Sequence, residues 1–267
     1  MIEQLFEIII LAIVQGIAEF LPISSSGHLV IVEHLLGITE PKLLCAIILH
    51  CGTLVAVIAV LWGYLFTIIR DSKAVLQKRC PFTESSFKVA LFALVATIPA
   101  VIVALFFKKS FENAFSSTIL TASFLLINGC ILYVTFYVKN HTKEVEHFTL
   151  THALLIGLAQ CVALFPGISR SGATITCALL CGMSPLFAFR FSFLLAIPAI
   201  IGAFVFEVKE FLTLSKDIFF VYGVGFFVSI IVGYFSLLLL RKLVKQNRLY
   251  YFSWYCWIIG ILVLIFR

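Results

Sequence analysis

The sequence has few charged residues. Asp, Glu, Lys and Arg make up 12% of its 267 residues, whereas soluble domains carry about 25%. Apolar residues account for 62%, and the mean hydropathy is +1.14. A soluble globular protein is therefore excluded, and the length suits one bundle of membrane-spanning helices. We predict a single membrane domain that covers residues 1–267.

The sequence also lacks the signs of a metal site, of nucleic-acid binding and of a cleavable signal peptide. The eight cysteines form no CxxC pair and no Cys/His spacing typical of a metal site, so we interpret them as small apolar core side chains. The net charge of +6 does not indicate nucleic-acid binding, because the basic residues lie in short loops between apolar runs. A cleavable signal peptide is not expected, because Glu3 and Glu7 stand where such a signal has basic residues.

Long apolar runs are abundant, and a spanning helix needs about 20 such residues. Six runs are candidates, at 44–69, 88–107, 116–138, 185–206, 218–240 and 251–267. Two further regions, 1–40 and 151–182, are apolar but interrupted by polar, Gly and Pro residues. We predict that each of them folds as two half-length helices with a break between.

Lys and Arg residues in the loops predict the orientation. Eleven of them lie at 70–88, 139–143 and 241–248, against four at 108–109 and 209–216. The positive-inside rule places the first three loops in the cytoplasm. Successive loops can then alternate between the two sides of the membrane only if region 151–182 enters and leaves the membrane on the same side, as a re-entrant hairpin.

The two interrupted regions resemble each other. QGIAEFLPISSSG (15–27) and QCVALFPGISRSG (160–172) align without gaps at an offset of 145, and seven of the thirteen positions are identical. We predict an internal repeat, with one copy in 1–140 and the other in 150–267. Each copy has three spans and one hairpin, so the second copy is inverted. The predicted fold is an all-α integral membrane protein with six transmembrane helices and two re-entrant helical hairpins whose tips meet near the midplane.

The second break predicts a phosphate cradle. A buried Arg170 costs at least about 2.5–3.5 kcal/mol in a membrane and needs an anion. Gly167 lets the backbone approach a ligand closely, and the helix that restarts after it offers free N–H groups. The hydroxyls nearby belong to Ser169, Ser171 and Thr174. The alternative is that Arg170 only forms a structural ion pair with Glu19.

The first break carries different groups. Gln15 and Glu19 are four residues apart and share a helix face, where their oxygens can hold a divalent cation that keeps phosphate and water ligands. Ser25 lies three residues before His28, which suits an activated hydroxyl or acid–base chemistry. The flanking hydroxyls are those of Ser24 and Ser26. Alternatively, these serines only cap a half-helix.

Two other polar residues in apolar runs are interpreted as structural or cavity-lining. His50 is expected to contact a helix or a cavity, and Arg190 to snorkel or to face a cavity.

The sequences of the two breaks together resemble the signatures of one known protein family. QGIAEFLPISSSGH resembles the first signature of the undecaprenyl-diphosphate phosphatases, PGISRSGAT resembles the second, and the resemblance covers the whole chain. It implies a multi-pass enzyme of the bacterial cytoplasmic (inner) membrane, of the bacitracin-resistance type. Such an enzyme hydrolyses undecaprenyl diphosphate to undecaprenyl phosphate and phosphate, which recycles the lipid carrier for cell-wall synthesis.

The resemblance also implies roles for residues. Glu19 and the Gln15 position serve a divalent cation, Mg or Ca, and a water; Ser25 and His28 match the catalytic pair; Arg170 matches the pyrophosphate-binding arginine. Ser169, Ser171 and Thr174 would support the phosphates. Many members carry a second Glu where this chain has Gln15, which leaves Glu19 as the motif's only carboxylate and puts a second, carboxylate-bridged metal in doubt.

Three questions stay open at the level of sequence. The nucleophile is Ser25, His28 or a water. The inverted repeat with broken helices also suits a carrier or flippase for a polyprenyl phosphate lipid. A homodimer is neither required nor excluded.

Overall fold

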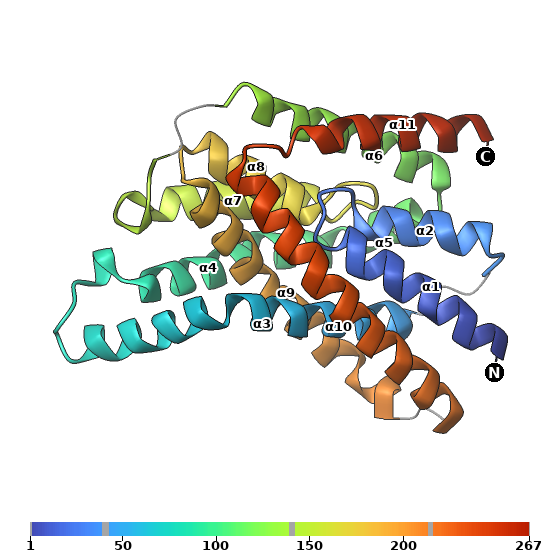
Figure 1. The fold of residues 1–267 in the computed structure, drawn as a ribbon, viewed down its shortest axis with the longest axis horizontal. Coiled ribbons are helices and arrows are strands. Elements are labelled where there is room, and N and C mark those ends of the chain that lie inside the picture. The colour runs from blue at the N-terminus through green and yellow to red at the C-terminus, as the bar shows by residue number, and fades with distance from the viewer. Residues whose placement is uncertain (1, 39–42, 139–141, 213–215, 267) are drawn as a thin grey trace.

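The chain folds into a bundle of helices (Figure 1). The computed structural model describes residues 2–38, 43–138, 142–212 and 216–266. Its α-helices are α1 (Ile2–Ala18), α2 (Ser25–Leu35), α3 (Leu43–Leu76), α4 (Ser86–Phe106), α5 (Lys108–Phe115), α6 (Thr118–Tyr133), α7 (Leu150–Val162), α8 (Arg170–Leu180), α9 (Pro185–Leu212), α10 (Lys216–Lys245) and α11 (Tyr251–Phe266). Short 3₁₀ turns are η1 (Phe82–Glu84), η2 (Val134–Phe136) and η3 (Val145–His147). The described residues contain no β-strand, only an isolated bridge between Lys143 and Met183.

Five helical segments are long and apolar enough to cross a membrane. They are Leu44–Leu76, Ser86–Phe106, Thr118–Phe136, Pro185–Val205 and Ile218–Lys245. The sixth predicted run forms α11, a helix of 16 residues, which is shorter than the about 20 residues a span needs. The all-helical, multi-pass membrane class is confirmed, while the sixth span stays a prediction.

Both interrupted regions fold as two helices with a break. The first consists of α1 and α2, and the second of α7 and α8. Each second helix has 11 residues, about 16 Å at 1.5 Å per residue, which is half the thickness of a bilayer core. The break between two helices is therefore confirmed for both regions, and half-length is confirmed for α2 and α8, whereas α1 is longer, with 17 residues.

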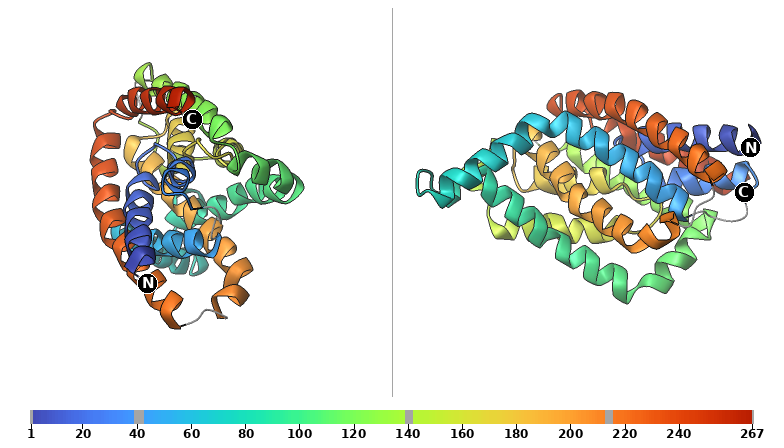
Figure 2. Two further views of the ribbon diagram at one scale, coloured as in Figure 1. Left: turned by 90° about the vertical axis from the view of Figure 1, so that its right-hand side faces the viewer. Right: turned by 90° about the horizontal axis from the view of Figure 1, so that it is seen from below.

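The long helices pack closely around these broken segments. α3 packs on α10, α6 on α11, α1 on α10 and α4 on α7. Small residues allow the approach: a side chain at Gly157 would lie 2.3 Å from the Ala96 carbonyl oxygen, as is common where membrane helices touch. Seen from below, α9 runs between α3 and α4 (Figure 2, right). Its residues Phe189 and Phe193 belong to the largest apolar cluster of the core.

The outer surface of the bundle is strongly apolar. Trp62, Leu105, Phe106 and Phe227 are each more than 60% exposed, an arrangement that suits lipid rather than water as the surrounding solvent. None of the eight cysteines is found in a disulfide. Our expectation that they are core side chains is confirmed for Cys45 and Cys256, which are buried, and is wrong for Cys130, which is exposed on this apolar surface.

The loops used to predict orientation are only partly described. The connection after α3 lies at the left of Figure 1, and the two chain ends lie at the right. Lys139 lies outside the described residues, and so do the side chains of Lys108, Lys209 and Lys216.

Candidate active site

The first break is formed by a proline and a serine cap. α1 ends at Ala18, and Pro22, which has no N–H group to donate, follows within the turn. Ser24 caps α2 by accepting a hydrogen bond from the Gly27 N–H at 3.2 Å. Its backbone has φ 71°, a left-handed conformation that is unusual for a residue with a side chain and concentrates at functional sites.

The second break repeats the serine cap at an offset of 145, although Ser169 has an extended backbone with φ −80° where Ser24 is left-handed. Ser169 caps α8 by accepting from the Gly172 N–H at 3.1 Å, as Ser24 does for Gly27. Gly167, with φ 103°, takes the turn position that Pro22 holds in the first break. Here glycine is required, because side chains rarely adopt that backbone conformation.

The two breaks touch each other. Ser24 Oγ accepts from the Gly167 N–H at 3.0 Å, and Ser171 Oγ donates to the Phe20 carbonyl at 3.0 Å. A Cβ atom added to Gly27 would lie 2.9 Å from Gly167 Cα, so the close approach needs glycine on both sides. The structure thus brings together the two motifs that the sequence singled out.

Asn128 of α6 holds this junction, and our sequence analysis missed it. It is fully buried, donates to the Pro22 carbonyl at 2.9 Å and accepts from the Ser169 N–H at 3.0 Å. One amide therefore satisfies a backbone group of each break. The feature of the sequence that could have indicated its role is a lone Asn inside the apolar run 116–138. An amide in a membrane span must find its hydrogen-bond partners within the protein.

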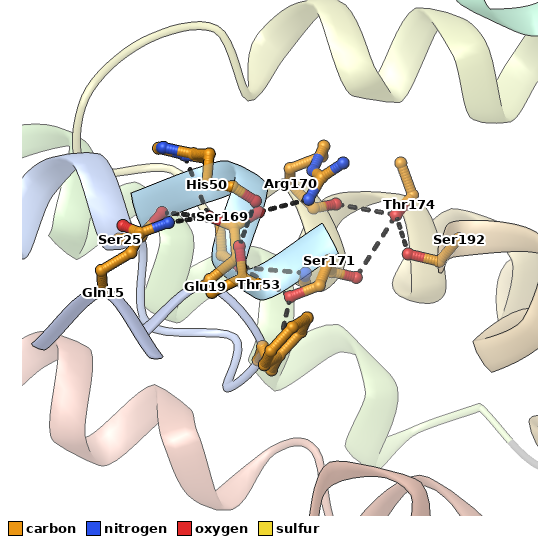
Figure 3. Close-up of polar contacts among 12 residues, drawn as sticks. Gln15, Glu19, Ser25, His50, Thr53, Ser169, Arg170, Ser171, Thr174 and Ser192 are labelled. Carbon is orange, nitrogen blue, oxygen red and sulfur yellow. Dashed lines mark hydrogen bonds and ion pairs between the residues drawn. The ribbon is translucent and has the colours of Figure 1, made fainter. Parts of the chain in front are cut away.

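Glu19 lies at the centre of the polar cluster (Figure 3). Its Oε1 pairs with Arg170 Nη2. Its Oε2 accepts from Ser25 Oγ at 2.7 Å and from Gln15 Nε2 at 3.1 Å. The side chain of Glu19 is only 6% exposed and that of Arg170 19%, so the ion pair is shielded from bulk solvent.

His50 of α3 is the second cation beside Glu19. Its Nε2 lies 3.2 Å from Glu19 Oε2, and its Nδ1 lies 2.7 Å from the Ala46 carbonyl oxygen. Both ring nitrogens face acceptors, so both carry a proton in this arrangement and the ring is positively charged. We had expected only a helix-contact or cavity residue here. The sequence around His50 does not indicate a contact with Glu19, because it is the position of α3 in the bundle that brings the two side chains together.

Two buried polar atoms of the cluster have no partner among the described residues. They are Arg170 Nη1, a donor, and Gln15 Oε1, an acceptor. Buried polar atoms in proteins are nearly always paired, so each exception needs an explanation. With Arg170 and His50 around one carboxylate, the cluster carries an excess positive charge and a spare guanidinium donor, which suits a bound phosphate.

A divalent cation fits this site only if it brings ligands with it. No group of three His, Cys, Asp or Glu residues that could hold a metal occurs among the described residues. The free Gln15 Oε1 is a hard oxygen ligand of the kind Mg²⁺ and Ca²⁺ prefer. Glu19 already accepts from four groups and would have to release one of them. The residues therefore fit a cation whose remaining ligands are phosphate oxygens and water.

His28 does not contact Ser25 in this structure. Its Nδ1 lies 2.8 Å from the Ser24 carbonyl oxygen, and its Nε2 lies 2.8 Å from the hydroxyl of Tyr255. Nδ1 therefore carries the proton, and Nε2 is free to accept from the tyrosine. Both Ser25 and His28 lie on α2, yet Ser25 is directed to Glu19. The predicted roles of both residues stay predictions, and Tyr255 of α11 joins them as a neighbour that the sequence did not indicate.

The remaining predicted phosphate ligands are engaged within the protein. Thr174 Oγ1 donates to the Arg170 carbonyl at 2.7 Å and lies 2.7 Å from Ser192 Oγ of α9. The hydroxyls of Ser169 and Ser171 are 3.1 Å apart, and Ser26 lies 3.3 Å from Ser24. These hydroxyls fix the shape of the breaks around Arg170.

Comparison with known proteins adds independent findings. The family model described as bacitracin resistance protein BacA matches residues 8–262. The chain is 39% identical over 269 residues to the undecaprenyl-diphosphatase of Alkaliphilus metalliredigens (strain QYMF), with 98% of each chain covered. It is 37% identical over 264 residues to that of Halothermothrix orenii, again with 98% of each covered. The undecaprenyl-diphosphatase of Methanosphaera stadtmanae is 41% identical over 269 residues, with 96% of each covered.

Proposed function

The chain belongs to the bacitracin resistance protein BacA family, and from this premise we propose that it hydrolyses undecaprenyl diphosphate to undecaprenyl phosphate and phosphate. The observation that carries the proposal is the junction of the two breaks. There Arg170, His50 and Ser25 converge on the single carboxylate of Glu19, and one guanidinium nitrogen is buried without a partner in the described part of the chain.

Arg170 binds and orients the diphosphate. Its unpartnered Nη1 donates to a phosphate oxygen, while Nη2 stays on Glu19. Together with the His50 charge, it neutralises the negative charge that builds on the phosphoryl oxygens as the bond to the leaving group breaks. Undecaprenyl phosphate is then a better leaving group, and its apolar tail remains in the lipid beside the bundle.

Ser25 is the nucleophile that the geometry favours. Its hydroxyl donates to Glu19 Oε2 at 2.7 Å, so Glu19 accepts the proton as Ser25 Oγ attacks the terminal phosphorus. The bond to undecaprenyl phosphate breaks, and Glu19 passes its proton to the departing phosphate oxygen. Water then attacks the phosphoserine, Glu19 accepts a proton from that water, and this proton returns to Ser25 Oγ as inorganic phosphate leaves. A water hydrogen-bonded to Glu19 in place of Ser25 would carry out the same hydrolysis in one step.

A divalent cation, Mg²⁺ or Ca²⁺, is part of the proposal. Glu19 and Gln15 Oε1 would hold it beside the diphosphate, where such an ion supplies charge neutralisation for the phosphate oxygens. What supports it is the free amide oxygen of Gln15 and the oxygen character of both ligands.

The finer membrane arrangement belongs to the same proposal. We place the α1–α2 and α7–α8 segments as re-entrant hairpins of an inverted repeat, with α11 as the sixth span, in the cytoplasmic membrane. The 16 Å length of α2 and α8 supports half-membrane helices. In a cysteine-free background, cysteines at Lys73 and Lys245 should be protected from an impermeant thiol reagent in intact cells, and one at Lys109 should react. Reaction at Lys245 would contradict the inverted arrangement.

Phosphate release from purified protein tests the activity. Undecaprenyl diphosphate in detergent micelles should yield inorganic phosphate with the wild-type chain, and the yield should collapse in Arg170→Ala at equal folded protein. Transport of intact lipid without phosphate release would favour a carrier instead. The carrier is not the favoured alternative, because the relatives compared above are named as diphosphatases.

A further inference from the structure

A second cavity lies between α3, α9 and α10, lined by none of the residues of the candidate active site. Its volume is about 240 Å³, and its wall includes Leu61, Tyr64, Phe189, Arg190 and Arg241. A single water occupies about 30 Å³ in the liquid, so the space is large enough for a phosphate group with part of its substituent. In sequence analysis Arg190 was expected to snorkel or to face a cavity, and the structure places it in the wall of one.

Two guanidinium groups face this cavity without a carboxylate. Arg190 and Arg241 come from different helices and form no ion pair with any described residue. The charges of Asp71 and Glu144 reach Tyr64, but neither carboxylate lines the cavity, and Asp71 Oδ2 accepts from the Ser86 N–H at 3.0 Å. Two positive charges across one partly apolar space repel each other, and an anion between them removes that cost.

Tyr64 adds a hydroxyl to the same wall. Its OH is buried beside the side chain of Ser86, and its ring lies under Arg190, with Cζ 4.8 Å from the ring centre. The cation–π contact fixes the guanidinium plane. A tyrosine hydroxyl beside two arginine guanidinium groups is a donor set that binds a phosphate.

The mouth of the cavity opens on the apolar outer surface. Gly63 is exposed, and a side chain added there would meet nothing within 4 Å. Its neighbour Trp62 is 67% exposed, and tryptophans favour the headgroup level of a bilayer. Arg241 stands near the end of α10, beside the exposed Lys242 and Lys245. A lipid headgroup could therefore enter sideways, as it does in other basic pockets between membrane helices.

This cavity is separate from the junction of the breaks. Arg190 is two residues before Ser192, whose hydroxyl contacts Thr174 of α8 at 2.7 Å. Side chains two positions apart on a helix point to nearly opposite sides, so Arg190 points away from the breaks. We propose that the α3–α9–α10 cavity is a second phosphate-binding site, whose ligand is the phosphate headgroup of an anionic membrane lipid or free inorganic phosphate, and whose mouth favours the lipid.

Thermal stability of the full purified chain tests the site, with two ligand arms. Phosphatidylglycerol is compared with zwitterionic phosphatidylcholine in mixed micelles, and inorganic phosphate is compared with chloride at equal ionic strength. The variants are Arg241→Gln, which removes one fork, and Gly63→Trp, which fills the mouth and leaves both arginines in place. Arg170→Ala is the matched control, because it removes an arginine of the candidate active site only.

We expect phosphatidylglycerol to stabilise the wild type and Arg170→Ala equally, and to bind Arg241→Gln and Gly63→Trp about tenfold more weakly, the loss typical of a charged hydrogen bond. The same pattern with inorganic phosphate alone identifies free phosphate as the ligand. Stabilisation that is absent in both arms, or that persists unchanged in both variants, overturns the proposal. Because Gly63→Trp retains every polar group of the wall, a loss in both variants cannot be assigned to misfolding around one missing charge.

Discussion

The two breaks share one serine-capping arrangement but differ in backbone conformation and in chemistry. Ser24 and Ser169, 145 residues apart, cap helices of the same length in the same way. At the same offset, however, Glu19 corresponds to Leu164, and Ser25 corresponds to Arg170. The ion pair at the centre of the site joins the unique acid of one break to the unique base of the other. Matching positions thus build the scaffold, and mismatched positions build the reactive cluster.

This comparison predicts its largest effect at Arg170. Replacing Arg170 with Ala should lower turnover by about 10³-fold or more, the scale of an arginine that stabilises a transferring phosphoryl group. Arg170→Lys should be nearly as poor, because an ammonium group cannot donate to Glu19 and to a phosphate in one plane. Phosphate release per folded molecule is the measurement. If the Lys variant keeps most of the turnover, Arg170 acts only as a charge.

Within the first break, Ser25 should matter more than His28. We expect Ser25→Ala to lower turnover by about 10²–10⁴, the span of a positioned proton-transfer or nucleophilic group. His28→Ala should cost less, because its ring contacts Ser24 and Tyr255. Rapid quenching followed by mass spectrometry should find phosphate on Ser25 in the wild type. Equal losses in both variants without a phosphoserine would favour a water nucleophile and a catalytic His28.

The paired glutamines offer a matched test. Gln15 and Gln160 hold corresponding positions, and each has a buried Oε1 that meets no hydrogen-bond partner among the residues the structure describes. Only Gln15 contacts Glu19. Changing Gln15 to Leu should therefore lower turnover by about tenfold and raise the Mg²⁺ concentration needed for half-maximal rate, since a metal ligand is lost. Gln160→Leu should leave both quantities unchanged. Similar kinetic losses in both would mean that the breaks contribute symmetrically.

The smallest expected effect is the loss of stability when either of the two capping serines is replaced. Ser24→Ala and Ser169→Ala each remove a helix cap, worth about 1 kcal/mol. Ser24 also accepts from Gly167, so its loss should be the larger of the two. Thermal unfolding of both variants should show a lower midpoint, with turnover per folded molecule close to wild type. A large loss of turnover in Ser169→Ala at normal stability would place its hydroxyl on the substrate.

Much of this architecture could be predicted because membrane sequences make polar residues conspicuous. Pro22, Gly167 and the serines indicated both breaks, and the repeat predicted that the two breaks meet, with an ion pair between Arg170 and Glu19 as the alternative to a phosphate cradle. Side-chain direction could not be predicted: Ser25 and His28 share α2, yet their partners are Glu19 and Tyr255. Asn128 was missed, and the contact of His50 with Glu19 was not predicted, because long-range packing of α6 and α3, rather than any local motif, brings them to the site.

A double-mutant cycle on Glu19 and Arg170 tests the central claim most directly. Phosphate release per folded molecule is measured for Glu19→Gln, Arg170→Gln and the double variant, with unfolding midpoints recorded beside it. A catalytic pair predicts that each single change costs at least about 10²-fold, while the double variant falls little below the worse single, because residues acting as a unit are not additive. A purely structural pair predicts unstable single variants, a double variant of restored stability, and nearly normal turnover per folded molecule in all three. That second result would contradict the active site described here.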